Sequence, residues 1–368
     1  MNELYIGMDV HSKSIYCIAQ DWFGKVLFDG RIETKPEVIK DFLLNFPGGR
    51  VPKGTQIGFE SGTQATWLSR LLDSLGMEPV VIDAHEVRKK ARRIGQKTDR
   101  RDAFEICEGI RKQMYDSIVY IPDEETQKLK DVLKKRRHFV NICVREKNSA
   151  KALLRGSGIS TSRLPLKGKT SWENLYKRLG DNYRSSYARM HMDVWEMAYK
   201  KVKELEVELN EALEPFKDIM DILTTVPGVG LITAATFIGS VGTPRRFPDS
   251  SRVVSYVGLA ASTFNSGERT QHGSITKRGP AELRAMLCEA AQSSRKSDNP
   301  FNPYFLRICS KKGYKKAIVA VAHKMAKILY QMWKRKETFD IRKTNIESGE
   351  FVKTKKVYYK IKKKAARV

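Results

Sequence analysis

The sequence is poor in residues that build disulfide or metal-linked frameworks. Its 368 residues contain only five cysteines, an odd number without paired spacing, which argues against a zinc cluster or a disulfide framework. The pattern predicts buried thiols in a reducing compartment. No apolar run is long enough to span a bilayer, and there is no secretory leader. We therefore expect a cytoplasmic protein with no membrane partner.

A phosphate-binding loop for ATP is also missing. Residues 168–171 (GKTS) look like the end of such a loop, but Arg163 stands where the leading glycine should be. No strong strand precedes the segment. We expect an ordinary loop here, and the sequence does not support ATP use.

Acidic residues are scarce relative to basic ones. There are 42 Asp and Glu against 68 Lys and Arg, a formal net charge of +26, which predicts a polyanionic partner such as nucleic acid. The tail over 353–367 has eight basic residues and no acid; it suits a nucleic-acid backbone, or equally a disordered polycation without specificity. A denser cluster, which could otherwise be a solvated helix face, comprises Arg88, Lys89, Lys90, Arg92, Arg93, Lys97, Arg100 and Arg101.

Four acidic residues in the first third of the chain stand where strands are expected to end and a helix to begin. Asp9 and Glu60 close apolar runs, and Asp99 and Asp102 lie one helical turn apart, on one face. Alone, each would be read as a solvated strand end or helix cap. Carboxylates are preferred Mg²⁺ ligands, and two such ions about 4 Å apart can hold the attacking and leaving oxygens of a phosphodiester. The set therefore predicts a metal-dependent phosphodiester enzyme.

The expected elements around these acids form a recognisable order. Strands are predicted over 4–10, 15–19, 25–32, 56–60 and 79–83, with helices over 36–46 and 63–75. This βββαβαβ order fits a ribonuclease-H-like sheet.

Three short motifs carry the four acids and resemble a known family. Segments 6–11 (IGMDVH), 58–62 (GFESG) and 97–103 (KTDRRDA) look like the DEDD motifs of the one-hundred-and-ten family of bacterial insertion-sequence transposases. The resemblance implies a first domain similar to the Holliday-junction resolvase RuvC. It also implies catalytic and metal-binding roles for Asp9, Glu60, Asp99 and Asp102.

A second set of motifs lies downstream. Segment 226–230 (VPGVG), before a helix expected over 231–241, resembles the family's Pro-Gly-x-Gly segment and equally fits a plain helix–helix turn. In the first reading, Gly228 and Gly230 let the backbone approach a phosphate. Segments 255–259, 265–267 and 273–279, with a helix expected over 281–294, match the family's C-terminal domain in order and spacing. The resemblance extends to about residue 333.

The resemblance places the family's catalytic serine at Ser266. A serine hydroxyl is a poor nucleophile unless a base takes its proton or a metal activates the target. From the residues alone, Ser266 would be an ordinary turn serine, with Ser262 and Ser274 equally plausible as nucleophiles. Nearby basic residues that fit a phosphate-holding site are Arg269, Lys277 and Arg278.

A long helical connector is expected between these regions. Apolar residues recur at three- and four-residue spacing from Leu129 and again from Trp195 to Ala212. Such helices can pair within one chain through a loop over about 156–193, or with a second subunit. The second alternative would give a homo-oligomer, a dimer or tetramer on nucleic acid, because recombination requires several active sites to meet.

These features together predict an α/β protein. We expect a RuvC-like DEDD catalytic domain over 1–115, a helical coiled-coil connector over 116–215, a mostly α-helical transposase domain with the catalytic serine over 216–337, and a basic tail over 338–368.

The predicted function is a metal-dependent DNA transposase or recombinase of the bacterial cytoplasm, associated with the nucleoid. It would use Mg²⁺ or Mn²⁺ and rejoin donor and target DNA through a phosphoserine, and the resemblance implies guidance by a structured non-coding bridge RNA. Two alternatives remain. A hydrolytic junction nuclease would need the acids but not Ser266, and a non-catalytic nucleic-acid-binding protein would need only the basic face.

Overall fold

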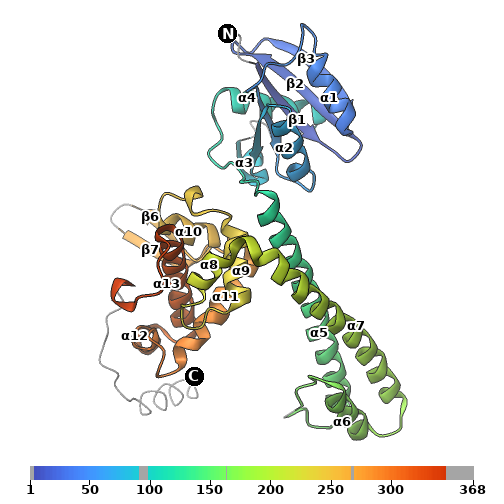
Figure 1. Cartoon of the computed structure of the whole chain (residues 1–368), viewed down its shortest axis with the longest axis vertical. Helices are drawn as coiled ribbons and strands as arrows, with labels where there is room; N and C mark the ends of the chain where they lie inside the picture. Colours follow the sequence, from blue (N-terminus) through green and yellow to red (C-terminus); the bar gives the residue numbers. More distant parts are fainter. Residues whose placement is uncertain (1–3, 91–97, 163, 267–268, 345–368) are drawn as a thin grey trace. The chain divides into compact units, whose positions relative to one another are not determined.

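The computed structural model describes residues 4–90, 98–162, 164–266 and 269–344, and within them all side chains except those of 263–272. The chain divides into two compact units, Met1–Ile121 and Pro122–Val368. We describe each unit by itself (Figure 1). No described helix has the length and apolar character needed to cross a membrane.

The first unit is built on a five-stranded sheet of order β3-β2-β1-β4-β5. β1 (Leu4–Val10), β2 (Ser14–Asp21) and β3 (Val26–Glu33) form an antiparallel meander, and β4 (Gln56–Glu60) and β5 (Glu78–Ile82) add in parallel. The helices are α1 (Pro36–Leu44), α2 (Ala65–Ser74), α3 (Ala84–Lys90) and α4 (Asp99–Arg111). The predicted mixed α/β class and the predicted element order are confirmed.

Helices cover both faces of the sheet, and strand alternation decides which residues each face receives. Ile6 and Met8 of β1 belong to the buried cluster formed with α1 and α2, whereas Tyr5 belongs to the cluster formed with α4. Because successive side chains of a strand point to opposite faces, Gly7 and Asp9 share the face of Tyr5. The end of β1 therefore delivers Asp9 to the side that α4 occupies.

A pair of glycines allows α4 to lie close to the sheet. Gly7 pairs with Gly58 across β1 and β4. A Cβ at Gly7 would lie 2.2 Å from the carbonyl oxygen of Ala103 and 2.7 Å from Cβ of Cys107, and one at Gly58 would lie 2.8 Å from Cγ2 of Ile110. The two glycines thus determine how closely α4, which carries Asp99 and Asp102, approaches the sheet. Each glycine also precedes one of the strand acids, Asp9 or Glu60, by two residues on the same face.

A methyl group at Gly7 is expected to push α4 away from the sheet. Overpacking of this kind costs about 1–3 kcal/mol, so Gly7→Ala should lower the free energy of unfolding by that amount and shift the acids of α4 relative to Asp9. Gly62→Ala is the control, because a Cβ there meets nothing within 4 Å. Urea unfolding measures the free energy of unfolding of both variants. Equal values would show that α4 accommodates the methyl group at Gly7 without a cost in stability.

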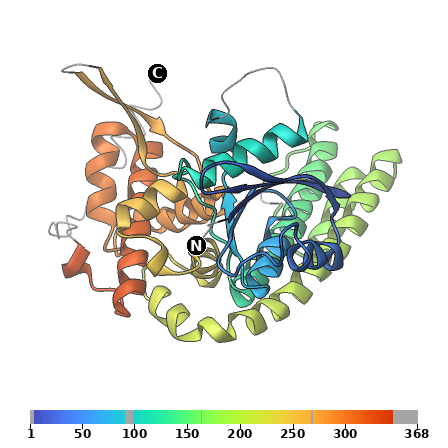
Figure 2. The same cartoon turned by 90° about the horizontal axis from the view of Figure 1, so that it is seen from above.

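The second unit is helical apart from one hairpin. Its elements are α5 (Glu124–Arg155), α6 (Lys169–Leu179), α7 (Tyr183–Leu213), α8 (Lys217–Leu223), α9 (Leu231–Val241), α10 (Ser250–Val257), β6 (Ala261–Ser266), β7 (Arg269–Ile275), α11 (Ala281–Ala291), α12 (Asn302–Lys312) and α13 (Tyr314–Arg335). Short 3₁₀ turns lie at Glu214–Phe216, Pro244–Arg246, Gln292–Arg295 and Ile341–Thr344. The orange ribbon of β6 and β7 projects from the helices in Figure 2.

Helices α5 and α7 pack along each other within one chain, which is the first of the two pairings that their apolar spacing allowed. Trp195 and Ala198 of α7 share a buried cluster with Ala150 and Leu154 of α5. Across the pair, Nδ1 of His191 lies 2.8 Å from Glu146. At the other end Leu129 and Leu209 join the core of α8 to α13, so the helix pair is anchored in that bundle.

The loop predicted over 156–193 is wrong in two places. Helix α6 occupies 169–179, and α7 begins at Tyr183, twelve residues before Trp195, where the second apolar run was predicted to begin. The GKTS segment is accordingly the first turn of α6 rather than an ordinary loop, with the Ser171 hydroxyl bonded to Gly168. Helix α6 has only one short stripe of apolar residues, Trp172, Leu175 and Leu179, all of them buried, which is too short to show a heptad pattern in the sequence.

All five cysteines are free thiols, as predicted, and only Cys288 is partly exposed. Burial raises the pKa of the Cys107 thiol to about 12. These thiols are packing residues of the core and not nucleophiles at neutral pH.

Candidate functional site

The first unit gathers acidic side chains at one edge of its sheet. Met8 of β1 pairs with Phe59 of β4, so that Asp9 and Glu60, the next residue on each strand, lie side by side near the ends of neighbouring strands. Ile57 and Phe59 face α1 and α2, so by alternation Glu60 shares the α4 face with Asp9. The two parallel strands thus carry their acids to the same edge and the same face.

Helix α4 supplies the other two acids in its first turn. Thr98 caps the helix by accepting a hydrogen bond from the backbone N–H of Arg101, 3.3 Å away, and Asp99 and Asp102 follow directly. Acidic side chains in a first turn are stabilised by the unpaired N–H groups of the helix start. The sequence Thr-Asp-x-x-Asp therefore favours a helix that begins here.

Three side chains converge closely enough to hold one cation. Nε2 of His11 lies 3.1 Å from Oδ2 of Asp9 and 3.5 Å from Oδ1 of Asp99, and one ligand atom from each residue lies within 4.8 Å of the other two. Among the described residues this is the group that meets that criterion. Asp9 is 16% exposed and Asp99 is 34% exposed, so a bound ion would keep an open side toward solvent or substrate. Two carboxylates and one imidazole fit a divalent transition metal, and the two carboxylates alone, with water ligands, also fit Mg²⁺.

His11 was not among the predicted ligands. It follows β1 in the tight turn to β2, where its backbone N–H donates to the carbonyl of Ser14 over 3.0 Å. The available signal was its spacing: a residue two positions after Asp9 in an extended segment lies on the same side. From the sequence alone, His11 could be a loop residue or could contact substrate.

Glu60 and Asp102 lie outside this three-residue group, although both have other interactions. The guanidinium of Arg88, at the end of α3, lies 3.8 Å from the Glu60 carboxylate. Asp102 is one turn further along α4 than Asp99. Their assignment as metal ligands stays a prediction.

Basic residues already offset part of the negative charge. Arg31 of β3 lies 2.6 Å from Oδ2 of Asp99, and Arg100 lies 2.6 Å from Asp29. The hydrogen bond from Arg100, followed by one from Tyr16, lowers the pKa of Asp29 despite its partial burial. These ion pairs connect the first turn of α4 to β3, and so hold Asp99 near Asp9.

The predicted basic cluster is described only in part. Arg88 is 79% exposed, and Arg101 pairs with Glu105 on its own helix over 3.0 Å. Lys89 is exposed at the end of α3. Arg92, Arg93 and Lys97 lie outside the described residues. Among the described members, Arg88 of α3 and Arg100 of α4 are therefore exposed beside the acids Glu60 and Asp99.

A buried carboxylate fixes α3, which carries Arg88. Glu86 accepts hydrogen bonds from the backbone N–H groups of Asp116 and Ser117 over 2.9 and 2.6 Å, and Lys90 lies 2.9 Å away. Burial acts to raise the pKa of Glu86, but these donors outweigh it and lower the pKa to about 2. Glu86 therefore connects α3 to the segment that follows α4.

We expect Glu86 to stabilise the fold at neutral pH and to contribute to acid unfolding. A folded-state pKa below the unfolded value gives stability that is present above about pH 4.5 and is lost as the pH falls toward 2. Glu86→Gln should lower the free energy of unfolding at pH 7 by about 1–2 kcal/mol and flatten its decline over that pH range. Urea unfolding at several pH values measures this free energy, and Glu78→Gln, at an exposed position, is the control. If the free energy of unfolding depended on pH in the same way in both variants, the prediction would be contradicted.

In the second unit, the two glycines of the 226–230 turn differ in their surroundings. Gly228 has φ +94°, and a Cβ there would meet Oγ of Ser293 at 2.0 Å and the carbonyl oxygen of Ala290 at 2.6 Å. Its lack of a side chain thus permits close packing on the end of α11. Gly230 begins α9 with nothing within 4 Å of a Cβ, so its backbone is open to a ligand.

Ser266 is the last residue of β6 and pairs with Arg269 of β7 across the hairpin. The side chains of both lie outside the described residues. At the base of the hairpin, Lys277 and Arg278 are exposed in a loop fixed by the bond from the Lys277 N–H to the Gly258 carbonyl, 3.1 Å. Ser266 therefore lies at the end of β6 farthest from the base of the hairpin.

Comparison with known proteins agrees with these two regions. A transposase profile of the IS110 DEDD type matches residues 6–158, and the profile described as Transposase IS116/IS110/IS902 family matches residues 220–305. Together they match more than half of the chain. The chain therefore belongs to the IS110 family of DEDD-type transposases.

Individual relatives extend over most of the chain. It is 27% identical to y4qE of Sinorhizobium fredii, over 80% of this chain and 72% of that protein. It is 24% identical to the transposase for insertion sequence element IS1111A of Coxiella burnetii, over 91% and 90%. It is also 24% identical to a pilin gene-inverting protein of Moraxella bovis, over 72% and 74%.

Proposed function

We propose that this protein cuts and rejoins DNA strands as a metal-dependent transposase, with Ser266 as the nucleophile. The observation that carries the metal-dependent part is the convergence of Asp9, His11 and Asp99 at the edge of the sheet. The placement of Ser266 at the end of β6, within the segment that matches the family profile, supports its role as the nucleophile. The first unit is, in this proposal, a ribonuclease-H-like domain of the RuvC type.

A divalent ion, Mg²⁺ or Mn²⁺, held by Asp9, His11 and Asp99 would polarise the oxygens of a scissile phosphate and offset their charge. The DEDD profile indicates divalent-metal use, and the donor set fits it. Glu60 and Asp102 complete the proposed acidic set. Arg88 and Arg100, exposed beside these acids, would hold the neighbouring phosphates of the strand.

The chemistry at Ser266 is a pair of transesterifications. In the first, a bond forms between Oγ of Ser266 and phosphorus, the bond from phosphorus to one deoxyribose oxygen breaks, and that deoxyribose leaves with a free hydroxyl. In the second, a deoxyribose hydroxyl of another end attacks the same phosphorus and releases the serine hydroxyl. Each step exchanges one phosphodiester for another, so no ATP is required.

Partners follow from the charge and from the family. We propose donor and target DNA as substrates and a structured non-coding bridge RNA as guide, with two or four copies of the chain on the nucleic acid. The net charge of +26 supports polyanionic partners. The relative named for inverting a pilin gene supports strand exchange, because inversion requires that cut ends be rejoined.

The proposal is tested by reconstituting strand exchange with purified protein, supercoiled DNA that carries the element ends, and a transcript of the flanking non-coding region. We expect rejoined junctions that require a divalent ion and are absent in EDTA, with the transcript directing the junction sequence. Cut but unjoined ends would favour the hydrolytic nuclease. Binding without any cutting, with or without metal, would favour the non-catalytic nucleic-acid-binding protein.

A further inference from the structure

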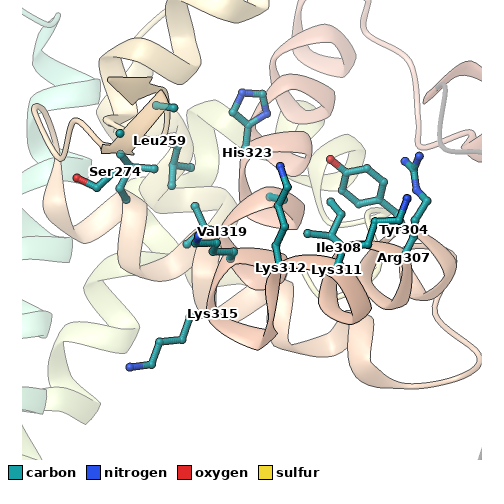
Figure 3. Close-up of a pocket in the computed structure, with 15 residues that line it drawn as sticks. Leu259, Ser274, Tyr304, Arg307, Ile308, Lys311, Lys312, Lys315, Val319 and His323 are labelled. Carbon is teal, nitrogen blue, oxygen red and sulfur yellow. The ribbon is translucent and has the colours of Figure 1, made fainter. Parts of the chain in front are cut away.

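A pocket in the second unit lies outside every site described above. It has a volume of about 680 Å³ and is bounded by α12, α13 and the base of the β6–β7 hairpin. Figure 3 shows Leu259 and Ser274 on one side and Tyr304 and Arg307 on the other, with Lys312 and His323 between them. Its volume is within the range of sites for small ligands, about 300–1,000 Å³.

The pocket combines an apolar wall with a cationic rim. Leu259, Ile308 and Val319 provide apolar surface, and none of the described residues that line the pocket is acidic. The rim consists of Arg307, Lys311, Lys312, Lys315 and Lys316. An apolar wall suits the flat face of a base, and a rim of cations suits its phosphate.

The four lysines of the rim, Lys311, Lys312, Lys315 and Lys316, place their positive charges close together. Within the described part of the chain, none of these lysines forms an ion pair with a carboxylate. Lys315 and Lys316 lie in the first turn of α13, where the helix dipole disfavours cations, and Gly313, with φ +83°, turns the chain so that Lys311 and Lys312 face the same solvent region. Mutual repulsion of these charges would be relieved by a bound anion.

Two polar groups inside the pocket remain neutral at physiological pH. Burial, with Lys327 and Lys324 nearby, lowers the pKa of His323, and burial raises the pKa of Tyr304. A neutral imidazole offers one donor and one acceptor, and a phenol offers a donor. Such groups can bond the edge of a base without adding charge.

We infer that this pocket binds one unpaired nucleotide of a single strand, with its base against the apolar wall and its phosphates on the lysine rim. This inference rests on the proposed function, since it assumes that the protein handles single-stranded nucleic acid. Ala261, Gly273 and Ser274 of the hairpin line the pocket, so a strand held there would run along the base of the element that carries Ser266. The strand can be DNA or RNA, which share this chemistry.

Photocrosslinking tests whether a base of the strand lies in the pocket. Single-stranded DNA and RNA oligonucleotides of one sequence, each with a single 5-iodouracil, are irradiated with the full-length protein, and the crosslinked peptide is identified by mass spectrometry. We expect a crosslink at Tyr304 that is lost in Tyr304→Leu. A crosslink from the DNA alone, the RNA alone or both supports the inference and identifies the strand. Crosslinks confined to other residues overturn it.

The salt dependence of binding tests whether the rim lysines contact the phosphates of the strand. Lys312→Ala/Lys316→Ala should reduce the slope of log K against log salt by about 1.4, since each contact to a single strand contributes about 0.7. The control Lys200→Ala/Lys217→Ala removes the same charge from exposed sites of α7 and α8. Equal slopes for both pairs would overturn the inference. Failure of wild-type protein to bind either strand would instead overturn the proposed function.

Discussion

Ser266→Ala is expected to abolish strand exchange and to remove a covalent protein–DNA adduct. If Oγ of Ser266 attacks phosphorus, a nicked substrate that loses its leaving strand should trap the DNA end on the serine. The alanine variant has no atom with which to form that bond, so its rejoining activity should fall by at least about 1,000-fold. Binding of DNA and RNA should change little, because one hydroxyl adds little beside many basic contacts.

Mass spectrometry of the trapped complex provides the direct measurement. Ser262→Ala is the matched control, because Ser262 lies on the same strand and its hydroxyl donates to the carbonyl of Ser274 over 3.0 Å. It should retain both the adduct and the activity. DNA attached at another residue, or efficient cutting by Ser266→Ala, would show that water or a different side chain is the nucleophile.

Asp9→Asn should eliminate metal-dependent activity while leaving the fold intact. The amide has the shape of the carboxylate but lacks its charge, so the group with His11 and Asp99 loses a charged ligand. We expect affinity for Mn²⁺ to fall by at least about 100-fold and strand exchange to become undetectable. The melting temperature should stay the same or rise, because the variant relieves repulsion between Asp9 and Asp99.

Asp41→Asn serves as the control for this prediction. Asp41 is an exposed acid of α1, a helix packed on the other face of the sheet, where it bonds Asn45 over 2.7 Å. It should retain Mn²⁺ binding and activity. Wild-type Mn²⁺ affinity in Asp9→Asn, measured by calorimetry, would mean that the three-residue group does not hold the ion.

Local patterns in the sequence predicted much of the first unit and of its acidic edge. Apolar runs along 4–10 and 56–60 were sufficient to place Asp9 and Glu60 at the ends of two strands, and two acids one turn apart were sufficient to predict the helix that begins at Asp99. These predictions succeed because a short apolar run and the spacing of one helical turn depend on residues a few positions apart. The helix α6 was missed for the converse reason, since its single apolar stripe is too short to reveal a period.

The sequence by itself therefore determined the element order of the first unit, the strand ends that carry acids, and the excess of positive charge. Only the tertiary structure decided which side chains meet. Gly7 and Gly58 allow α4 to pack closely on the sheet beside β1. For this reason His11 lies near Asp99, and Arg31 pairs with the same carboxylate. The nucleotide pocket likewise joins residues from 259 to 323 that share no local pattern. Contacts between residues far apart in the chain depend on how elements pack, and no local periodicity encodes them.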